Sequence, residues 1–353
     1  MFRRAMTLIV AVLLLAGFAV GAVYLPVPYL VASPGIALDT LGESEGERII
    51  RIDGTRSYRH EGALSMVTVQ YTGGPDTHMD LFTVLGAWLS PTQAVLPQEA
   101  LFPPDQSVEE ITRTQTVEMN SSQRTATAAA LTQLGVDYET EAYVAQVKKG
   151  KPAQGELRKG DVIARVDGEP VAGKDEAVEL VGDRRPGAAV SLTLDREGAD
   201  EPVKAEVETT AGDEGDAVIG ILVADRMEFP FEVDISVGEI GGPSAGMMFS
   251  LGVIDRLSPE GLTGGHQIAG TGTITPEGEV GGVSGVAQKM VSAERLGAEY
   301  FFVAADSCSQ TFDSAATGEI DVVKVGELAD AVDALKKIRN GEEAGDLPRC
   351  QPG

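Results

Sequence analysis

Polar and apolar residues alternate along segment 231–237, and the pattern then changes to that of a helix. Every second residue of this segment is apolar, as in a strand with one buried face. A glycine-rich stretch follows at 241–246, and apolar residues then recur at helical spacing in 247–257. Pro243 suits a first helical turn, because its missing N–H would find no partner there. The pattern predicts a strand, a tight turn and a helix, with Ser244 at the start of that helix.

The start of a helix is a favourable place for a nucleophilic serine. Free backbone N–H groups and the positive end of the helix dipole stabilise a developing oxyanion there. Ser244 is therefore a candidate nucleophile. The alternative interpretation is a small serine that merely starts a helix.

A second helical pattern spans 286–297 and places a lysine among apolar residues. Val286, Ala293 and Leu296 mark the apolar face, and Lys289 falls on the same face. Burial penalises the ammonium form and so lowers the pKa of a lysine held there. A neutral amine could take a proton from Ser244. Alternatively, the lysine packs its stem on the core while its head reaches water.

Three motifs surround these residues: Gly-Pro-Ser-Ala-Gly at 242–246, Gly-Thr-Gly-Thr-Ile-Thr at 270–275 and Val-Ser-Gly-Val-Ala-Gln-Lys at 283–289. In order and spacing they resemble the proteolytic domain of Lon proteases. The whole chain is similar to bacterial membrane-anchored, PDZ-containing Lon-like serine proteases of the YlbL type. This resemblance implies an α+β fold with an N-terminal transmembrane helix and a PDZ domain inserted before a Lon-type α/β proteolytic domain.

The resemblance also implies roles for individual residues. Ser244 and Lys289 would form a catalytic Ser-Lys dyad, with the hydroxyl of Thr271 close to the amine. The supporting residues of the serine motif are Gly242, Pro243 and Ala245.

Two positions depart from the family pattern. Gly241 stands where ATP-dependent Lon enzymes carry an acidic residue. Ser284 replaces the first glycine of the pair that usually precedes the lysine. Neither departure changes the dyad.

Residues 1–25 form the predicted membrane anchor and its cytoplasmic tip. Arg3 and Arg4 precede a mainly apolar run of 21 residues that ends at Leu25. As a helix, such a run spans about 31 Å, enough for a bilayer core. The arginines favour a cytoplasmic N-terminus. We expect a single-pass protein of the bacterial cell membrane with its catalytic part outside the cytoplasm; the alternative is a cleaved signal peptide.

The rest of the chain divides by its patterns into four parts. Strands in 26–120 are expected to complete the sheet of the protease domain, which itself covers 213–340. Residues 121–212 form the predicted PDZ domain, indicated by a Gly-x-Leu-x-x-Gly-Asp-x-Ile pattern that starts at Gly155. Residues 341–353 are a polar tail.

PDZ domains bind an extended peptide between a strand edge and a helix. In this chain the resemblance points to the edge of 141–147 and the helix at 175–181. The candidate peptide-binding residues are Tyr143, Val144, Ala145 and Val178. The alternative is a spacer that positions or covers the active site without binding a peptide.

Only two cysteines occur, Cys308 and Cys350. A location outside the cytoplasm permits a disulfide, which would fold the tail back over the protease domain. The two residues are a disulfide candidate, and closing the loop of about 40 residues would contribute about 4 kcal/mol; the alternative is two free thiols.

Composition excludes several other classes of site. A net charge of −26, from 54 acidic and 28 basic residues, argues against nucleic-acid partners. The chain has no Gly-Lys-Ser/Thr phosphate loop, so no ATP is expected. Its three scattered histidines make a poor metal site and supply no Ser-His-Asp triad. We therefore expect neither a metal nor a cofactor.

These observations lead to two hypotheses about function. The first is an ATP-independent, membrane-anchored serine endopeptidase that hydrolyses extracytoplasmic or membrane-associated proteins, with a PDZ domain that binds peptide or gates access. Lon protease domains often form rings, so the resemblance also implies that homo-oligomers can form. The second hypothesis is a non-catalytic, membrane-tethered PDZ scaffold.

Overall fold

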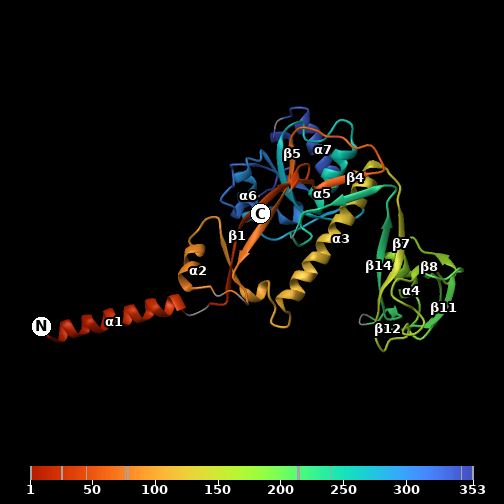
Figure 1. Ribbon diagram of the computed structural model, residues 1–353, viewed down its shortest axis with the longest axis horizontal. Helices are drawn as coiled ribbons and strands as arrows, with labels where there is room; N and C mark the ends of the chain where they lie inside the picture. The colour runs from red at the N-terminus through yellow and green to blue at the C-terminus, as the bar shows by residue number, and fades with distance from the viewer. Residues whose placement is uncertain are drawn as a thin grey trace. The chain divides into compact units, whose positions relative to one another are not determined.

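The computed structural model describes residues 2–24, 27–44, 46–75, 77, 79–212, 215–238, 240–342 and 344–351. The chain divides into two compact units (Figure 1). Unit 1 comprises residues 1–136 and 231–353, and unit 2 comprises residues 137–230. Unit 2 is therefore inserted into unit 1 along the chain.

Unit 1 is built around a mixed sheet whose six described strands follow the order β20-β19-β16-β5-β1-β6. The strands are β1 (Tyr29–Asp39), β5 (Ala63–Thr72), β6 (Ala94–Pro97), β16 (Gln267–Thr271), β19 (Tyr300–Ala304) and β20 (Asp321–Val325). β16 pairs in parallel with both β5 and β19, whereas β1 is antiparallel to β5 and β6. The β16–β5 pairing joins the segments on either side of unit 2 into one sheet.

Helices cover both faces of this sheet. Neighbouring strand residues alternate between two cores, so that Ile268 and Phe302 face one core while Ala269 and Phe301 face the other. The first core includes residues of α3, α5 and α7, and the second includes residues of α6. The helices are α2 (Leu81–Trp88), α3 (Val108–Leu134), α5 (Gly246–Leu257), α6 (Val286–Leu296) and α7 (Leu328–Arg339). Strands buried on both faces explain the continuous apolar runs of β16 and β19.

Shorter elements complete unit 1. Among the short strands, β2 pairs with β3, β4 with β15, and β17 with β18. These elements are β2 (Glu43–Ser44), β3 (Glu47–Arg48), β4 (Ile50–Asp53), β15 (Glu232–Ile235), β17 (Thr273–Ile274), β18 (Val280–Gly281), η1 (Gln98–Ala100), η2 (Ala305–Asp313) and η3 (Ala344–Asp346).

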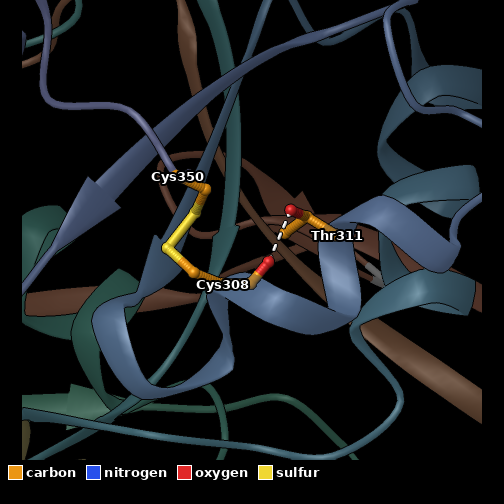
Figure 2. The surroundings of a disulfide bond; sticks show 3 residues. All are labelled: Cys308, Thr311 and Cys350. Carbon is orange, nitrogen blue, oxygen red and sulfur yellow. Dashed lines mark hydrogen bonds between the residues drawn. A yellow bond between two sulfur atoms is a disulfide. The ribbon is translucent and has the colours of Figure 1, made fainter. Parts of the chain in front are cut away.

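A disulfide joins Cys308 of η2 to Cys350 of the C-terminal tail, as Figure 2 shows. The Thr311 hydroxyl donates a hydrogen bond to the Cys308 carbonyl at 2.7 Å within the same element. Pro348, two residues before Cys350, accepts a hydrogen bond from the backbone of Lys324 in β20. The expected bond is thus present and holds the tail against the edge of the sheet.

Helix α1 (Phe2–Tyr24) takes up the apolar N-terminal run, and Arg3 and Arg4 lie within its first turn. A helix that crosses a bilayer needs about 20 consecutive, predominantly apolar residues. No helix in the described part of the chain combines the length and the apolarity that a crossing requires. This finding contradicts the predicted transmembrane anchor at residues 1–25 and the single-pass membrane location. Leu25 lies outside the described residues.

Unit 2 contains a strongly curved sheet and one helix. Its main strands follow the order β11-β10-β8-β7-β14, with β9 paired to β8. The elements are β7 (Glu139–Val147), β8 (Val162–Val166), β9 (Glu169–Pro170), α4 (Lys174–Gly182), β10 (Ala189–Asp195), β11 (Val203–Glu208), β12 (Thr210–Ala211), β13 (Ala217–Val218) and β14 (Ile221–Glu228). Alternate residues of these strands, with Ala177 of α4, form a separate apolar core.

The boundaries of unit 2 differ from the predicted PDZ range of 121–212. Helix α3 packs on α5 through Ala126 and Ala129 and so belongs to unit 1. Strand β14 pairs along its length with β7 and so belongs to unit 2, although its residues were assigned to the protease domain. Both differences arise from tertiary pairing between segments distant in sequence, which local patterns do not reveal.

Candidate active site

Ser244 lies in the turn that precedes α5. Gly242 has a φ of 90°, in the left-handed region that glycine adopts without strain. Its N–H donates to the carbonyl of Gln115 on α3 at 3.0 Å. A Cβ atom at Gly241 would lie 2.9 Å from the Cβ of Gln115. The close approach of α3 therefore gives a steric reason for glycine at 241.

Lys289 reaches Ser244 from the first turns of α6. Its Nζ lies 2.9 Å from the Oγ of Ser244 and 3.0 Å from the Oγ1 of Thr271, across 45 and 18 residues of sequence. The residue is only 4% exposed, and this burial lowers the pKa of Lys289 to about 8. Burial is the cause of this pKa shift. No carboxylate of the described chain forms an ion pair with the amine that would oppose it. The neutral form of the Lys289 amine is therefore populated near physiological pH.

Thr271, at the end of β16, orients the amine. Its hydroxyl donates to the carbonyl of Ser244 at 3.0 Å, and the N–H of Gly272 donates to the same carbonyl at 2.9 Å. Because its one proton is used there, Oγ1 of Thr271 can only accept from Lys289. A neutral amine that donates to Thr271 keeps its lone pair available for the Ser244 hydroxyl.

Backbone donors lie next to the nucleophile candidate. Helix α5 begins at Gly246, with Ala245 as its N-cap residue. Within the described ranges, the N–H groups of Ser244 and Ala245 have no hydrogen-bond acceptor. Unpaired N–H groups at a helix N-terminus are suited to a developing oxyanion.

A cavity of about 600 Å³ opens beside Ser244 and Lys289. Strand β16 pairs with β5 only from Ala63 to Met66. The wall of the cavity continues along β5 beyond that point, over residues 68–71. One edge of β5 thus borders the cavity and offers backbone groups to an extended peptide.

Helix α3 supplies a wall of the cavity that the sequence analysis did not anticipate. Gln115 and Met119 line the cavity, and Ser122 follows on the same helical face. In the sequence, the sign that these residues share one face of a helix is their spacing of four and three positions. The analysis assigned the C-terminal half of this helix to the PDZ domain and did not place it beside Ser244.

Element η2 holds the turn before α6. The hydroxyl of Ser307 accepts from the N–H of Val283 at 2.8 Å, and the side-chain oxygen of Gln310 accepts from the N–H of Val286 at 3.3 Å. Cys308 lies between these two residues and ties η2 to the tail. The disulfide therefore supports the element that fixes the start of the lysine helix.

A second cavity, of about 490 Å³, lies within unit 2 between α4 and β14. Val178, one of the candidate peptide-binding residues, lines it together with the apolar–glycine–apolar sequence 219–221. Tyr143, Val144 and Ala145 do not line it, because β7 is an inner strand paired with β8 and β14 on its two sides. The outermost strand beside the cavity is β14, and not the predicted edge of residues 141–147.

Two histidines, His60 and His266, lie in the described part of the chain. Nε2 of His60 lies 2.9 Å from the carbonyl of Ser258, and His266 lies 2.8 Å from Glu299, and neither lines the catalytic cavity. His78 lies outside the described residues. In the part of the chain that the structure describes, no group of histidines, cysteines and carboxylates is arranged to hold a metal ion.

Comparisons with known proteins concern the central part of the chain. A family model of the PDZ domain matches residues 114–207. A probable periplasmic serine endoprotease, DegP-like, from Pseudomonas fulva (strain 12-X) is 33% identical over 107 residues, which are 30% of this chain. The chain spans 22% of the length of that relative.

Two solved structures are also similar. They are the PDZ domains of SdrC-like proteins from Listeria innocua and Listeria monocytogenes, which are 28% and 27% identical. They cover 24% and 25% of this chain and 92% and 90% of their own, with TM-scores of 0.22 and 0.23. The chain therefore contains a PDZ domain.

Proposed function

We propose that this protein is an ATP-independent serine endopeptidase in which Ser244 and Lys289 act as a Ser-Lys dyad, as in Lon-like proteases. The Oγ of Ser244 attacks the carbonyl carbon of the scissile peptide bond while the neutral amine of Lys289 takes the hydroxyl proton. The ammonium then gives this proton to the leaving nitrogen. Water hydrolyses the resulting ester through the same amine and regenerates the serine.

The observation that carries the proposal is the 2.9 Å separation of Nζ and Oγ in a buried site. Lowering the pKa of Lys289 from 10.5 to about 8 costs about 3 kcal/mol. A protein that only binds peptides gains nothing from burying an unpaired lysine at this cost in free energy. In a hydrolase, the same burial supplies a base that is largely neutral at slightly alkaline pH.

The three sequence motifs support the same proposal. They contribute Ser244, Thr271 and Lys289, respectively, and these are the residues joined by hydrogen bonds. The distant endoprotease relative agrees with a proteolytic role in general.

The two cavities suggest how a protein substrate binds. An extended segment would lie along the edge of β5 in the catalytic cavity, with its scissile carbonyl beside Ser244. A second extended peptide would add to β14 in unit 2 and either recruit the substrate or regulate access. The cavity of unit 2 also favours the second candidate function, a PDZ scaffold without hydrolysis.

The deciding experiment measures hydrolysis of an unfolded protein such as casein by the full chain. Ser244→Ala and Lys289→Gln are expected to lower kcat by a factor on the order of 10⁴ or more. Exposed Ser236→Ala and Lys336→Gln serve as matched controls with unchanged activity. A fluorophosphonate probe should label the wild-type protein but not Ser244→Ala. Equal activity in all five proteins, or none in the wild type, would favour the scaffold.

A further inference from the structure

Helix α3 makes a direct contact with the backbone of the nucleophile turn. The hydroxyl of Ser122 donates a hydrogen bond to the carbonyl of Pro243 at 3.1 Å, across 121 residues of sequence. Ser122 is 7% exposed, whereas its neighbour Ser121 is exposed. The contact is therefore a specific interaction of one buried side chain with the residue before Ser244.

The Pro243 carbonyl belongs to the peptide group whose other end is the N–H of Ser244. A peptide group is planar, so a hydrogen bond that holds its oxygen also fixes the direction of its N–H. Within the described residues, that N–H has no acceptor of its own. The other hydrogen bond that the Pro243 carbonyl accepts from a described residue comes from the N–H of Gly246, at the longer distance of 3.4 Å.

We infer that Ser122 is a positioning residue for oxyanion stabilisation. Its hydroxyl holds the peptide group between Pro243 and Ser244, so that the N–H of Ser244 points at the oxygen that becomes negatively charged. Ser122 touches neither the substrate nor the dyad and acts only through this peptide group. The inference rests on the proposed function, because it assigns part of the same reaction.

The surroundings of Ser122 determine which variants test this role. A Cβ atom at Gly246 would lie 3.0 Å from the Ser122 Oγ, so the hydroxyl packs tightly against the start of α5. On another side, a cavity of about 180 Å³ borders Ser122 and Pro243. This space can take one methyl group. Ser122→Thr therefore keeps the hydroxyl, and Ser122→Ala removes it.

The experiment measures the kinetics of peptide hydrolysis by the full chain and its inhibition by a peptide boronate. A boronate forms a tetrahedral adduct on the serine, so its affinity reports oxyanion stabilisation. Removing one direct oxyanion donor lowers kcat by about 10²- to 10³-fold. For Ser122→Ala, which only misdirects a donor, we expect about a tenfold loss in kcat and in boronate affinity, with KM changed less than twofold.

Controls separate this role from general packing. Ser121→Ala should match the wild type, and Ser122→Thr should restore kcat and boronate affinity. The apparent pKa of the pH–rate profile should stay the same in Ser122→Ala, because Lys289 is untouched. If the alanine variant does not fold, Ser122→Cys, of similar size but with a weaker donor, takes its place.

Two results would overturn the inference. In the first, Ser122→Ala equals Ser121→Ala in both kcat and boronate affinity. In the second, Ser122→Ala lowers kcat but leaves boronate affinity unchanged, or Ser122→Thr restores neither quantity. Either outcome would mean that the Ser122 side chain only supports packing. Failure of the proposed function is distinguishable, because Ser244→Ala would then keep the activity of the wild type.

Discussion

Arg196 of unit 2 and Lys289 of unit 1 are both basic side chains with little exposure to solvent, and their surroundings are opposite. In unit 2, Arg196 binds Asp161 through two hydrogen bonds of 2.8 and 2.7 Å and donates a third to the carbonyl of Glu156. In unit 1, the side-chain partners of Lys289 among the described residues are the hydroxyls of Ser244 and Thr271. One cation is paired with a carboxylate, and the other is not.

The pKa values follow from this difference. The hydrogen bond to Asp161 raises the pKa of Arg196, although burial opposes it. Burial alone would raise the pKa of Asp161, but the hydrogen bonds from Arg196 and from the backbone of Arg158 outweigh it and lower that pKa. At Lys289 burial acts unopposed and lowers the pKa to about 8. A buried charge with a partner keeps its charged form, whereas an unpaired buried amine is a candidate for a site where the neutral form is used.

The largest expected effect comes from breaking the pair in unit 2. Arg196→Met leaves the buried carboxylate of Asp161 without its partner and should lower the free energy of unfolding by about 3 kcal/mol. Denaturant unfolding measures this change. Arg226→Met, which removes a partly exposed ion pair with Glu141 at the longer distance of 3.9 Å, should cost less than about 1 kcal/mol. If the two variants lower the free energy of unfolding equally, the burial of Asp161 adds nothing to the cost of breaking its ion pair with Arg196.

Replacing the buried Lys289 of unit 1 should instead raise the free energy of unfolding. Lys289→Met removes a desolvation cost of about 3 kcal/mol and loses two hydrogen bonds, so we expect a gain of about 1 to 2 kcal/mol at pH 7. In the unfolded chain the lysine pKa is about 10.4. Below pH 8 both states carry the proton, and the wild type bears the full cost.

This stability gain depends on pH. Between pH 8 and 10 the folded wild type loses its proton first, so its relative stability rises and the advantage of Lys289→Met shrinks. Unfolding at pH 7 and at pH 9.5 measures the trend, with exposed Lys336→Met as the control. A variant that is less stable than the wild type by the same amount at both pH values would contradict an unpaired, buried amine.

A smaller effect is expected from the hydroxyl that orients the amine. Thr271→Val removes the acceptor for Lys289 and one of the two donors to the Ser244 carbonyl. We expect kcat/KM to fall roughly tenfold, a part of the 10²- to 10⁴-fold that proton transfer by a positioned base contributes. Thr273→Val, two residues further on, is the matched control. If the two variants behave alike, the Thr271 hydroxyl has no role in orienting Lys289.

The residues that meet around Ser244 were accessible from sequence because their signals are local. A glycine-rich turn before a helix identified Ser244, and an apolar helical face that includes Lys289 indicated its burial. The resemblance in motif order then linked them with Thr271. In the structure the Nζ of Lys289 lies 2.9 Å from the Oγ of Ser244 and 3.0 Å from the Oγ1 of Thr271; the catalytic role of the three residues is a proposal.

Contacts between distant segments were not accessible in the same way. The predicted PDZ range begins at residue 121, in the middle of α3, because α3 itself begins after the capping box of Ser107 and Glu110. The two hydroxyls at 121 and 122 look alike in sequence, and only the packing of α3 on α5 distinguishes them. The pairing of β14 with β7 likewise joins segments about 80 residues apart, so the edge beside α4 was assigned to the wrong strand.

The most direct test of the account is the titration of the Lys289 amine in the folded protein. Lysine labelled with carbon-13 at Cε gives a chemical shift that follows protonation, and the Lys289 signal is identified by its absence in Lys289→Gln. The account predicts a midpoint at about pH 8. A midpoint near the ordinary lysine value of about 10.4 would contradict a neutral base beside Ser244.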